Sequence, residues 1–433
     1  MNTCEKHSRY YSEHEECTKI AVMFLRIGGL WSLNSGFIFV NRLYYIYSSF
    51  TKFMTFYFLI AFILELFANN TLEETMEILI LWITSIHLLA KLLIFHFNKQ
   101  QIEILFETVK NNFSVHKHYL TTENRKIILS TMQMSRKINI FYAVLLNLGM
   151  TFYVDFVPLV TSVTYTNGTT IMERKLPFKV WVPLDITTSA YYVHAYVFLT
   201  VASHILATLL VATQSVFLTL IICLTGQFEL LCDALRNMLT NVNYRLQHNS
   251  DKGSTKWKSK ELEEDASYSD EPTDLFLAEA EIYLKECIKH HQSLIEFAEK
   301  FDNVWKTTFF VQFLTASFLV CFLGFQAMLM PFGLNLIKML IFIFVELFEL
   351  GVACKFGSDL MTQSEDVYRA VYDSDWYNQS TRFKQSARML IMRAQKPVRL
   401  TAGRLGILSQ PLFAAILRSS YSYLALLRQM HDD

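Results

Sequence analysis

Long apolar stretches separated by polar segments dominate this sequence. A helix needs about 20 apolar residues to cross the roughly 30 Å hydrocarbon core of a bilayer. The pattern therefore predicts an all-α, seven-transmembrane helical bundle, whose fourth helix is long enough to project beyond the membrane. The predicted spans are about 44–68, 76–97, 138–160, 190–223, 307–330, 336–357 and 405–427.

An earlier apolar run, Ile20 to Val40, is interrupted by Arg26, Gly28 and Gly29, which favours a helix that lies in the membrane interface or re-enters it. The polar segments between the spans then divide the chain into six parts. These are an N-terminal segment (1–43), helices one to four (44–223), a large polar segment (224–306), helices five and six (307–357), a further polar segment (358–404), and the last helix with the C-terminus (405–433).

The segment 224–306 contains two helix-like stretches, Gln227 to Leu246 and Leu275 to Phe301, with apolar residues three or four positions apart. Between them, about 248–272 is rich in Lys and Glu and is predicted to be a disordered insert. The flanking helices cannot bury their apolar faces alone. We expect them to pack on each other or on neighbouring subunits, as helical extensions that anchor an oligomer.

Charge predicts the orientation of the bundle. Lys and Arg are concentrated in 1–52, 98–137, 224–306 and 358–404, and few lie in the alternate segments. Basic residues near spans mark the cytoplasmic side, so the N-terminus is expected to be cytoplasmic and the C-terminus extracellular. This orientation is opposite to that of a G-protein-coupled receptor. All cysteines fall in predicted cytoplasmic or membrane segments, so no disulfide is expected on the outer side.

Composition excludes several classes of function. The chain is 52% hydrophobic and 18% charged, and Lys plus Arg equals Asp plus Glu at 39 each, so nucleic acid is not an expected partner. The sequence has no phosphate-binding loop, no H-E-x-x-H, no C-x-x-C and no G-x-S-x-G. We expect neither catalysis, nor a cofactor, nor a metal site.

Ionisable residues within the predicted spans are costly and should face protein or water. Glu346 and Glu349 are one helical turn apart, and a structural ion pair, with Lys355 for example, is favoured over a cation path. Three other ionisable residues lie near the predicted outer ends of the spans, where a side chain can reach the membrane interface. These are Asp155, Lys338 and His194.

Aromatic residues gather toward the outer halves of several spans and could form an apolar ligand cage. An interfacial aromatic belt with ordinary packing is the competing interpretation. The residues are Trp82, Phe152, Tyr153, Phe156, Tyr191, Tyr192, Tyr196 and Phe342.

The most specific motifs lie near the C-terminus: Ser364 to Val367, Tyr372 to Tyr377, and Met392 to Pro397. They resemble the insect odorant receptor family, in which similar text precedes a last helix that opens with Thr-Ala-Gly, here at 401–403. That helix closes with Tyr, five apolar residues and Gln, here Tyr423 to Gln429; Arg428 and Ser422 depart from the pattern. An Arg-Ile-Gly-Gly-Leu-Trp start at 26–31 adds to the resemblance.

The resemblance implies a subunit of a tetrameric, ligand-gated, nonselective cation channel in the plasma membrane of olfactory neurons. Its partners would be an odorant co-receptor subunit, a small volatile ligand and membrane lipid. Transferred to this sequence, the resemblance implies a gate at Leu426, Gln429 and Met430, a coupling role for Tyr372, Asp375, Trp376 and Tyr423, and an odorant pocket with Trp82, Ile83, Phe152, Tyr153, Phe156, Tyr192, Tyr196 and Phe342.

Three other classes of membrane protein share some of these features. A gustatory receptor shares the topology and the Tyr-to-Gln ending, but the Asp-Trp-Tyr and Arg-Ala-Gln-Lys-Pro text favours an odorant receptor. A G-protein-coupled receptor is disfavoured by orientation. A secondary transporter, suggested by Glu346 and Glu349, predicts an internal repeat that the sequence does not show.

Overall fold

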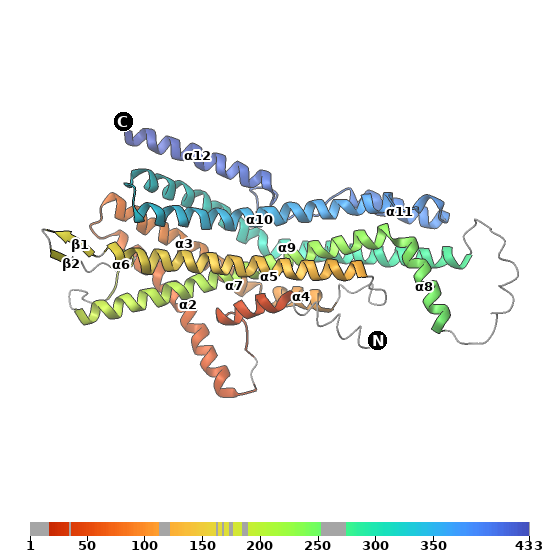
Figure 1. Ribbon diagram of the computed structural model, residues 1–433, viewed down its shortest axis with the longest axis horizontal. Helices are drawn as coiled ribbons and strands as arrows, with labels where there is room; N and C mark the ends of the chain where they lie inside the picture. Colours follow the sequence, from red (N-terminus) through yellow and green to blue (C-terminus); the bar gives the residue numbers. More distant parts are fainter. Residues whose placement is uncertain are drawn as a thin grey trace.

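The protein is a helical bundle with one short β-hairpin (Figure 1). The computed structural model describes residues 17–33, 36–111, 122–161, 163–166, 169–172, 176–183, 189–252 and 274–432. The helices are α2 (Ile38–Leu66), α3 (Leu72–Phe97), α4 (Lys99–Asn111), α5 (Thr122–Thr151), the π-helix η1 (Phe152–Phe156), α6 (Val157–Thr161), α7 (Ser189–Arg236), α8 (Met238–Lys252), α9 (Asp274–Leu329), α10 (Leu334–Tyr372), the 3-10 turn η2 (Trp376–Asn378), α11 (Thr381–Ala394) and α12 (Gln410–Asp432). The antiparallel strands β1 (Val163–Thr166) and β2 (Thr169–Met172) form the hairpin.

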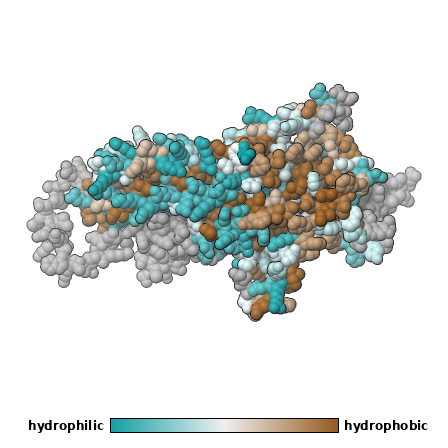
Figure 2. Space-filling model, turned by 180° about the vertical axis from the view of Figure 1, so that it is seen from behind, coloured by the Kyte–Doolittle hydropathy of each residue, from teal (hydrophilic) through white to brown (hydrophobic). Residues whose placement is uncertain are grey.

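The long helices run along the long axis of the molecule, with the hairpin at one end and α8 and α11 at the other (Figure 1). We call these the hairpin half and the polar half, the latter comprising the described residues of 224–306 and 358–404. Hydrophobic residues cover the visible face of the hairpin half, and hydrophilic residues cover that of the polar half (Figure 2). This division is expected of a bundle whose hairpin half lies in a membrane and whose polar half lies in water.

Among the described helices, five are long and apolar enough to cross a membrane by length and composition: α2, α3, the α5–η1–α6 unit, α7 and α9. The predicted sixth and seventh spans correspond to α10 and α12. The apolar part of α10 carries Lys338, Glu346 and Glu349, and α12 contains serines, tyrosines and Arg418, which lowers the apolar character of both helices. All seven predicted spans nevertheless correspond to helices, the last of which begins at Gln410 rather than at 405.

Two helices extend through both halves. The prediction of a long fourth helix is confirmed, because α7 is a single helix of 48 residues. The predicted stretches Leu275 to Phe301 and 307–330 are joined in one 56-residue helix, α9. At about 1.5 Å per residue, α9 is more than twice as long as a bilayer core is thick, so its polar N-terminal part lies outside any membrane. The predicted insert 248–272 begins within α8, and its residues from 253 lie outside the described residues.

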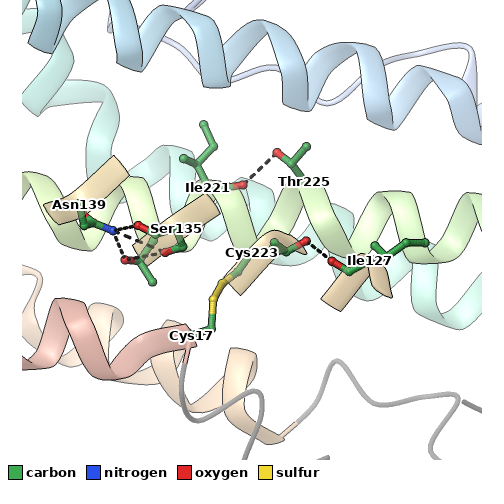
Figure 3. The surroundings of a disulfide bond; sticks show 9 residues. Cys17, Ile127, Ser135, Asn139, Ile221, Cys223 and Thr225 are labelled. Carbon is green, nitrogen blue, oxygen red and sulfur yellow. Dashed lines mark hydrogen bonds between the residues drawn. A yellow bond between two sulfur atoms is a disulfide. The ribbon is translucent and has the colours of Figure 1, made fainter. Parts of the chain in front are cut away.

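A short helix over 17–27 packs its buried residues Ala21 and Leu25 into the main core. A disulfide joins Cys17 of this helix to Cys223 of α7, 206 residues away (Figure 3). Nothing in the sequence predicts this pair, although both cysteines lie in segments that are not expected on the outer side. The linkage fixes the start of the described chain to the centre of the bundle.

Close packing of α5 against α7 sets the rotation of both helices. Asn139 donates a hydrogen bond to the Oγ1 of Thr219, 3.1 Å away (Figure 3). At Gly226 a Cβ atom would lie 2.5 Å from the Oγ1 of Thr131, so only glycine permits this approach. The faces of α5 that point inward are therefore decided by contacts between residues far apart in the sequence.

The family resemblance predicts that Thr401-Ala402-Gly403 opens the last helix. In the structure these residues instead form a turn before it. Thr401 and Ile407 form a β-bridge, and Gly403 adopts a φ of 58°, a conformation that favours glycine. Asp302 of α9 accepts hydrogen bonds from the Thr401 amide at 2.6 Å and from its hydroxyl at 3.1 Å. The motif thus attaches the start of α12 to α9.

Candidate functional site

A cavity of about 130 Å³ lies inside the hairpin half, between α2, α3, α5, η1, α7 and α10. Most of its wall is apolar. The aromatic part of the wall is formed by Phe58, Phe62, Tyr153, Phe178 and Phe342, and the aliphatic part includes Leu81, Leu88, Leu146, Met150, Leu206, Ala207, Leu210, Ile341 and Val345. An apolar cavity of roughly 150 Å³ holds a benzene molecule, so this one is suited to a small organic ligand.

Two of the eight predicted ligand-binding residues line the cavity. Tyr153 and Phe342 meet edge to face, with ring centroids 5.8 Å apart. Trp82 and Ile83 pack against the surrounding core without reaching the cavity wall.

The other four predicted residues lie away from the cavity wall. Phe152 and Phe156 stack on each other at 5.4 Å, and Phe156 is 48% exposed. Tyr192 and Tyr196 form a tilted pair 6.1 Å apart. These four side chains form the kind of aromatic surface expected at a membrane interface.

Three aromatic residues that the sequence does not single out complete the cage. The ring centroids of Phe58 and Phe62 in α2 are 5.7 Å apart, and Phe178, between the hairpin and α7, lies within 6.0 Å of both. The sequence places Phe58 and Phe62 one turn apart in an apolar run rich in Phe, but many phenylalanines share that property. Only the packing of α2 against α3 and α7 identifies which of them point inward.

A buried polar cluster closes the cavity at the end nearer the polar half. Glu349 forms an ion pair with Lys91 of α3, and both side chains are at most 4% exposed. Glu349 also accepts hydrogen bonds from Tyr142 of α5 at 2.7 Å and from Gln312 of α9 at 3.0 Å. The prediction of a structural ion pair for Glu349 is confirmed, but its partner is Lys91, because Lys355 points to Asp359 of its own helix at 2.8 Å.

A second ion pair lies on the opposite side of the cavity. Lys338 binds Glu77 at 2.7 Å and stands over the ring of Tyr153, 4.2 Å from its centroid, while the Tyr153 hydroxyl donates to Glu77 at 2.9 Å. The expectation that Lys338 reaches the interface is wrong, whereas the side chain of Asp155 is 32% exposed. Lys338 is buried, and Asp155 contacts His204 of α7 at 3.1 Å. Partners within the bundle stabilise these charges at membrane depth.

The predicted gate residues lie on α12, which diverges from the bundle toward its C-terminus (Figure 1). Leu426 is 54% exposed, Tyr423 is 60% exposed, and Gln429 is exposed, while the side chain of Met430 lies outside the described residues. One face of α12 does contact the bundle. Gly324 of α9 lies against the side chain of Leu424.

The remaining predicted coupling residues lie at the far end of the polar half, away from α12. Tyr372 ends α10 and is 69% exposed, Asp375 accepts a hydrogen bond from Tyr377 at 3.1 Å, and Trp376 packs against the main core. A direct link between α10 and the start of α12 lies elsewhere. The hydroxyl of Ser358 accepts a hydrogen bond from the Gln410 amide at 3.0 Å.

This α10–α12 link is unusually close at Gly357. A Cβ atom at this position would lie 2.4 Å from the carbonyl oxygen of Leu408. Six residues nearer the hairpin, Gly351 lies against the ring of Phe413. The sequence offers no sign of these contacts, because glycine within a predicted span has many possible roles.

Comparison with known proteins agrees with this architecture. Putative odorant receptor 85d of Drosophila melanogaster is 27% identical over 261 residues, covering 60% of this chain and 55% of the relative. Odorant receptor 13a of the same species is 26% identical over 278 residues, covering 60% and 59%. The chain thus spans somewhat more than half the length of these two relatives.

Solved structures show the same fold. The insect olfactory receptor OR5 from Machilis hrabei in complex with eugenol superposes with a TM-score of 0.75 at 16% identity, covering 97% of this chain and 99% of that one. The same receptor in a second structure gives a TM-score of 0.74. The family described as 7tm Odorant receptor matches residues 71–421. Since this match covers most of the chain, the protein belongs to the seven-transmembrane odorant receptor family and is a membrane protein.

Proposed function

We propose that this chain is the odorant-binding subunit of a ligand-gated, nonselective cation channel, and that the cavity of the hairpin half is its odorant site. The observation that carries this proposal is the cavity itself, which is lined by aromatic and aliphatic side chains from several helices. Burial of apolar surface would supply most of the binding free energy. Because few directional bonds are available, we expect modest affinity for small volatiles.

The proposed orientation places the polar half in the cytoplasm and the hairpin outside the cell. It rests on the concentration of Lys and Arg in segments that include 224–306 and 358–404. The hydrophobic surface of the hairpin half supports membrane insertion at that end (Figure 2). Odorants would then reach the cavity from the outer half of the bilayer or from the extracellular side.

We assign the pore to α12. In a single chain, its exposed face includes Tyr423 and Leu426, as expected of a helix that meets other subunits or a pore. Four such helices, with Leu426, Gln429 and Met430 at the constriction, would close by excluding water and conduct when they separate. The partner subunits would include the odorant co-receptor.

Helix α10 is the proposed route from cavity to pore. Phe342 and Val345 line the cavity, and the same helix contacts the start of α12 through Gly357 and Ser358. A ligand that binds more tightly when α10 is in one position than in another would shift the equilibrium between the two positions. The size of the shift in α10, and hence in α12, is set by that difference in affinity. Tyr372, Asp375 and Trp376 are proposed to take part at subunit contacts of the polar half.

The test is whole-cell current from cells that express this chain alone, with an odorant co-receptor, and the co-receptor alone, challenged with a panel of volatiles in the absence of added nucleotides. We expect a cation-selective, odorant-evoked current that requires both chains. Surface labelling must show both chains at the plasma membrane. Uptake of a labelled solute by this chain alone, without any current from the pair, would contradict the proposal.

A further inference from the structure

One carboxylate of the cavity wall has no partner. Glu346 lines the cavity and is 8% exposed, and among the described residues no hydrogen bond or ion pair to it is found. The two lysines beside the cavity are already paired, Lys91 with Glu349 and Lys338 with Glu77. A buried carboxyl group without a hydrogen-bond or ion-pair partner is costly, so a ligand that supplies a donor would stabilise it.

A second unpartnered group lies at the same end of the cavity. His87 is 2% exposed and lines the cavity, and its Nε2 has no hydrogen-bond partner in the described part of the chain. His87 precedes Lys91 by one turn of α3, just as Glu346 precedes Glu349 by one turn of α10. Lys91 and Glu349 are in contact, and His87 and Glu346 both line the cavity, each one turn before its neighbour of that ion pair.

The hydroxyl groups of the wall offer acceptors rather than donors. Thr84, Ser85 and Ser203 each donate their proton to the carbonyl oxygen four residues earlier, at 2.9, 2.9 and 2.8 Å. A hydroxyl has one proton, so what remains for a ligand is its lone pairs. Together with Glu346, the wall therefore favours a ligand that donates hydrogen bonds and carries positive charge.

We propose that this end of the cavity binds the ammonium group of a small hydrophobic amine, with Glu346 as its counter-ion. An ammonium group has three donors and no acceptor, which matches the wall. The aromatic residues Phe58, Phe62 and Tyr153 would enclose the hydrocarbon part of the amine. The inference rests on the proposed function, because it names the ligand class of the same cavity.

The experiment compares 2-phenylethylamine, 2-phenylethanol and ethylbenzene, which share a skeleton and differ in the polar group. Currents from the receptor with its co-receptor and the melting temperature of the purified complex are both measured. We expect the amine to act at a concentration at least tenfold below that of the alcohol, and the hydrocarbon to be weakest. In Glu346→Gln, the ratio of amine to alcohol potency should fall at least tenfold, and Glu346→Asp should restore part of it.

The matched control is the same substitution one turn away. Glu349→Gln removes the counter-ion of Lys91 and should lower the melting temperature of the ligand-free complex, whereas Glu346→Gln should not, because the Glu346 carboxyl group has no hydrogen-bond or ion-pair partner to lose. Equal destabilisation by both variants would overturn the inference. So would equal potency of amine and alcohol, or an amine that neither evokes current nor raises the melting temperature of the wild type.

Failure of this inference is distinguishable from failure of the proposed function. An alcohol or hydrocarbon that evokes a current requiring both chains, with no preference for the amine, leaves the channel proposal standing. Absence of current to every volatile, with both chains at the surface, counts against the channel proposal itself.

Discussion

The two halves of the bundle are packed in different ways. In the polar half and the adjoining centre, aromatic rings fill the core. The ring centroid of Phe301 lies 4.5 Å from that of Trp305 and 5.5 Å from that of Phe217. The hairpin half is instead hollow at its centre and contains buried ion pairs beside the cavity. The comparison suggests that a dense core holds the assembly together, while an incompletely filled one leaves room for a ligand and for movement.

The halves are connected by continuous helices rather than by a hinge. Helices α7, α9 and α10 run through both, and α10 is the helix that lines the cavity and also approaches the start of α12 at Gly357, as the proposed coupling requires. Four predictions test this contrast, from the largest effect on stability to the smallest.

The largest effect is expected for Lys91→Met. This change leaves the Glu349 carboxylate buried without its cation, which should cost about 3–5 kcal/mol. We expect little complex at the cell surface and a strongly lowered melting temperature. The double variant Lys91→Met with Glu349→Met should recover much of the loss, because no unpaired charge remains. A single variant as stable as the wild type would show that the pair contributes nothing.

Phe301→Ala and Phe58→Ala compare the two cores directly. Loss of a ring from the dense core at Phe301 should cost about 3–5 kcal/mol, since the neighbours cannot fill the space. Phe58 already borders a cavity, so its loss should cost less stability but alter the odorant dose response. Melting temperatures and dose responses of both variants distinguish these outcomes. The reverse order of stability would refute the contrast.

His291 should make the polar half sensitive to acid. Burial, with a smaller contribution from the nearby Arg393, lowers the pKa of His291 to about 4, below the 6.5 of an exposed histidine. The unfolded chain therefore binds a proton that the folded chain does not. The contribution of neutral His291 to the free energy of unfolding is therefore fully present above pH 6.5. It is lost as the pH falls toward 4, and the loss is about 2–3 kcal/mol at pH 4.5. His291→Phe should flatten this dependence in melting curves between pH 7 and 4.5, and an unchanged slope would exclude the residue as its source.

The smallest effect is expected at the attachment of α12. Asp302→Ala removes the acceptor for both the amide and the hydroxyl of Thr401, at a cost of about 1–3 kcal/mol. Because the turn before α12 would be loosened, we expect a shift in the odorant concentration for half-maximal current at normal surface expression. Thr401→Val removes only the hydroxyl bond and should have a smaller effect. No change in either variant would argue against this attachment as part of gating.

The helices could be predicted well from the sequence, because each is defined by a local apolar run of the right length. The all-α bundle of seven predicted spans and the long α7 follow from this pattern. The hairpin has a local signal that the pattern of spans does not use, an Asn-Gly pair at 167–168 between residues of high β-propensity. The turn at Thr401 to Gly403 could not be predicted, because it depends on contacts such as that of Asp302 with Thr401, which lie 99 residues apart.

The cavity was harder to predict, because composition does not reveal which face of a helix points inward. The π-helix η1 adds a residue to its turn and thereby changes the facing of the residues around it. Tyr153 points into the cavity while its neighbours Phe152 and Phe156 do not line it. Similarly, the partner of Glu349 is 258 residues away on α3, and no spacing rule within one helix could identify Lys91.

The most direct test of the odorant site is a pair of variants on α7. Ala207 is fully buried and lines the cavity, whereas Val201 on the same helix is 52% exposed. With the co-receptor present, Ala207→Phe should fill the cavity and raise the odorant concentration for half-maximal current at least tenfold, while Val201→Phe should leave it within about twofold. Equal responses from the two variants at equal surface expression would contradict the assignment of the cavity as the odorant site.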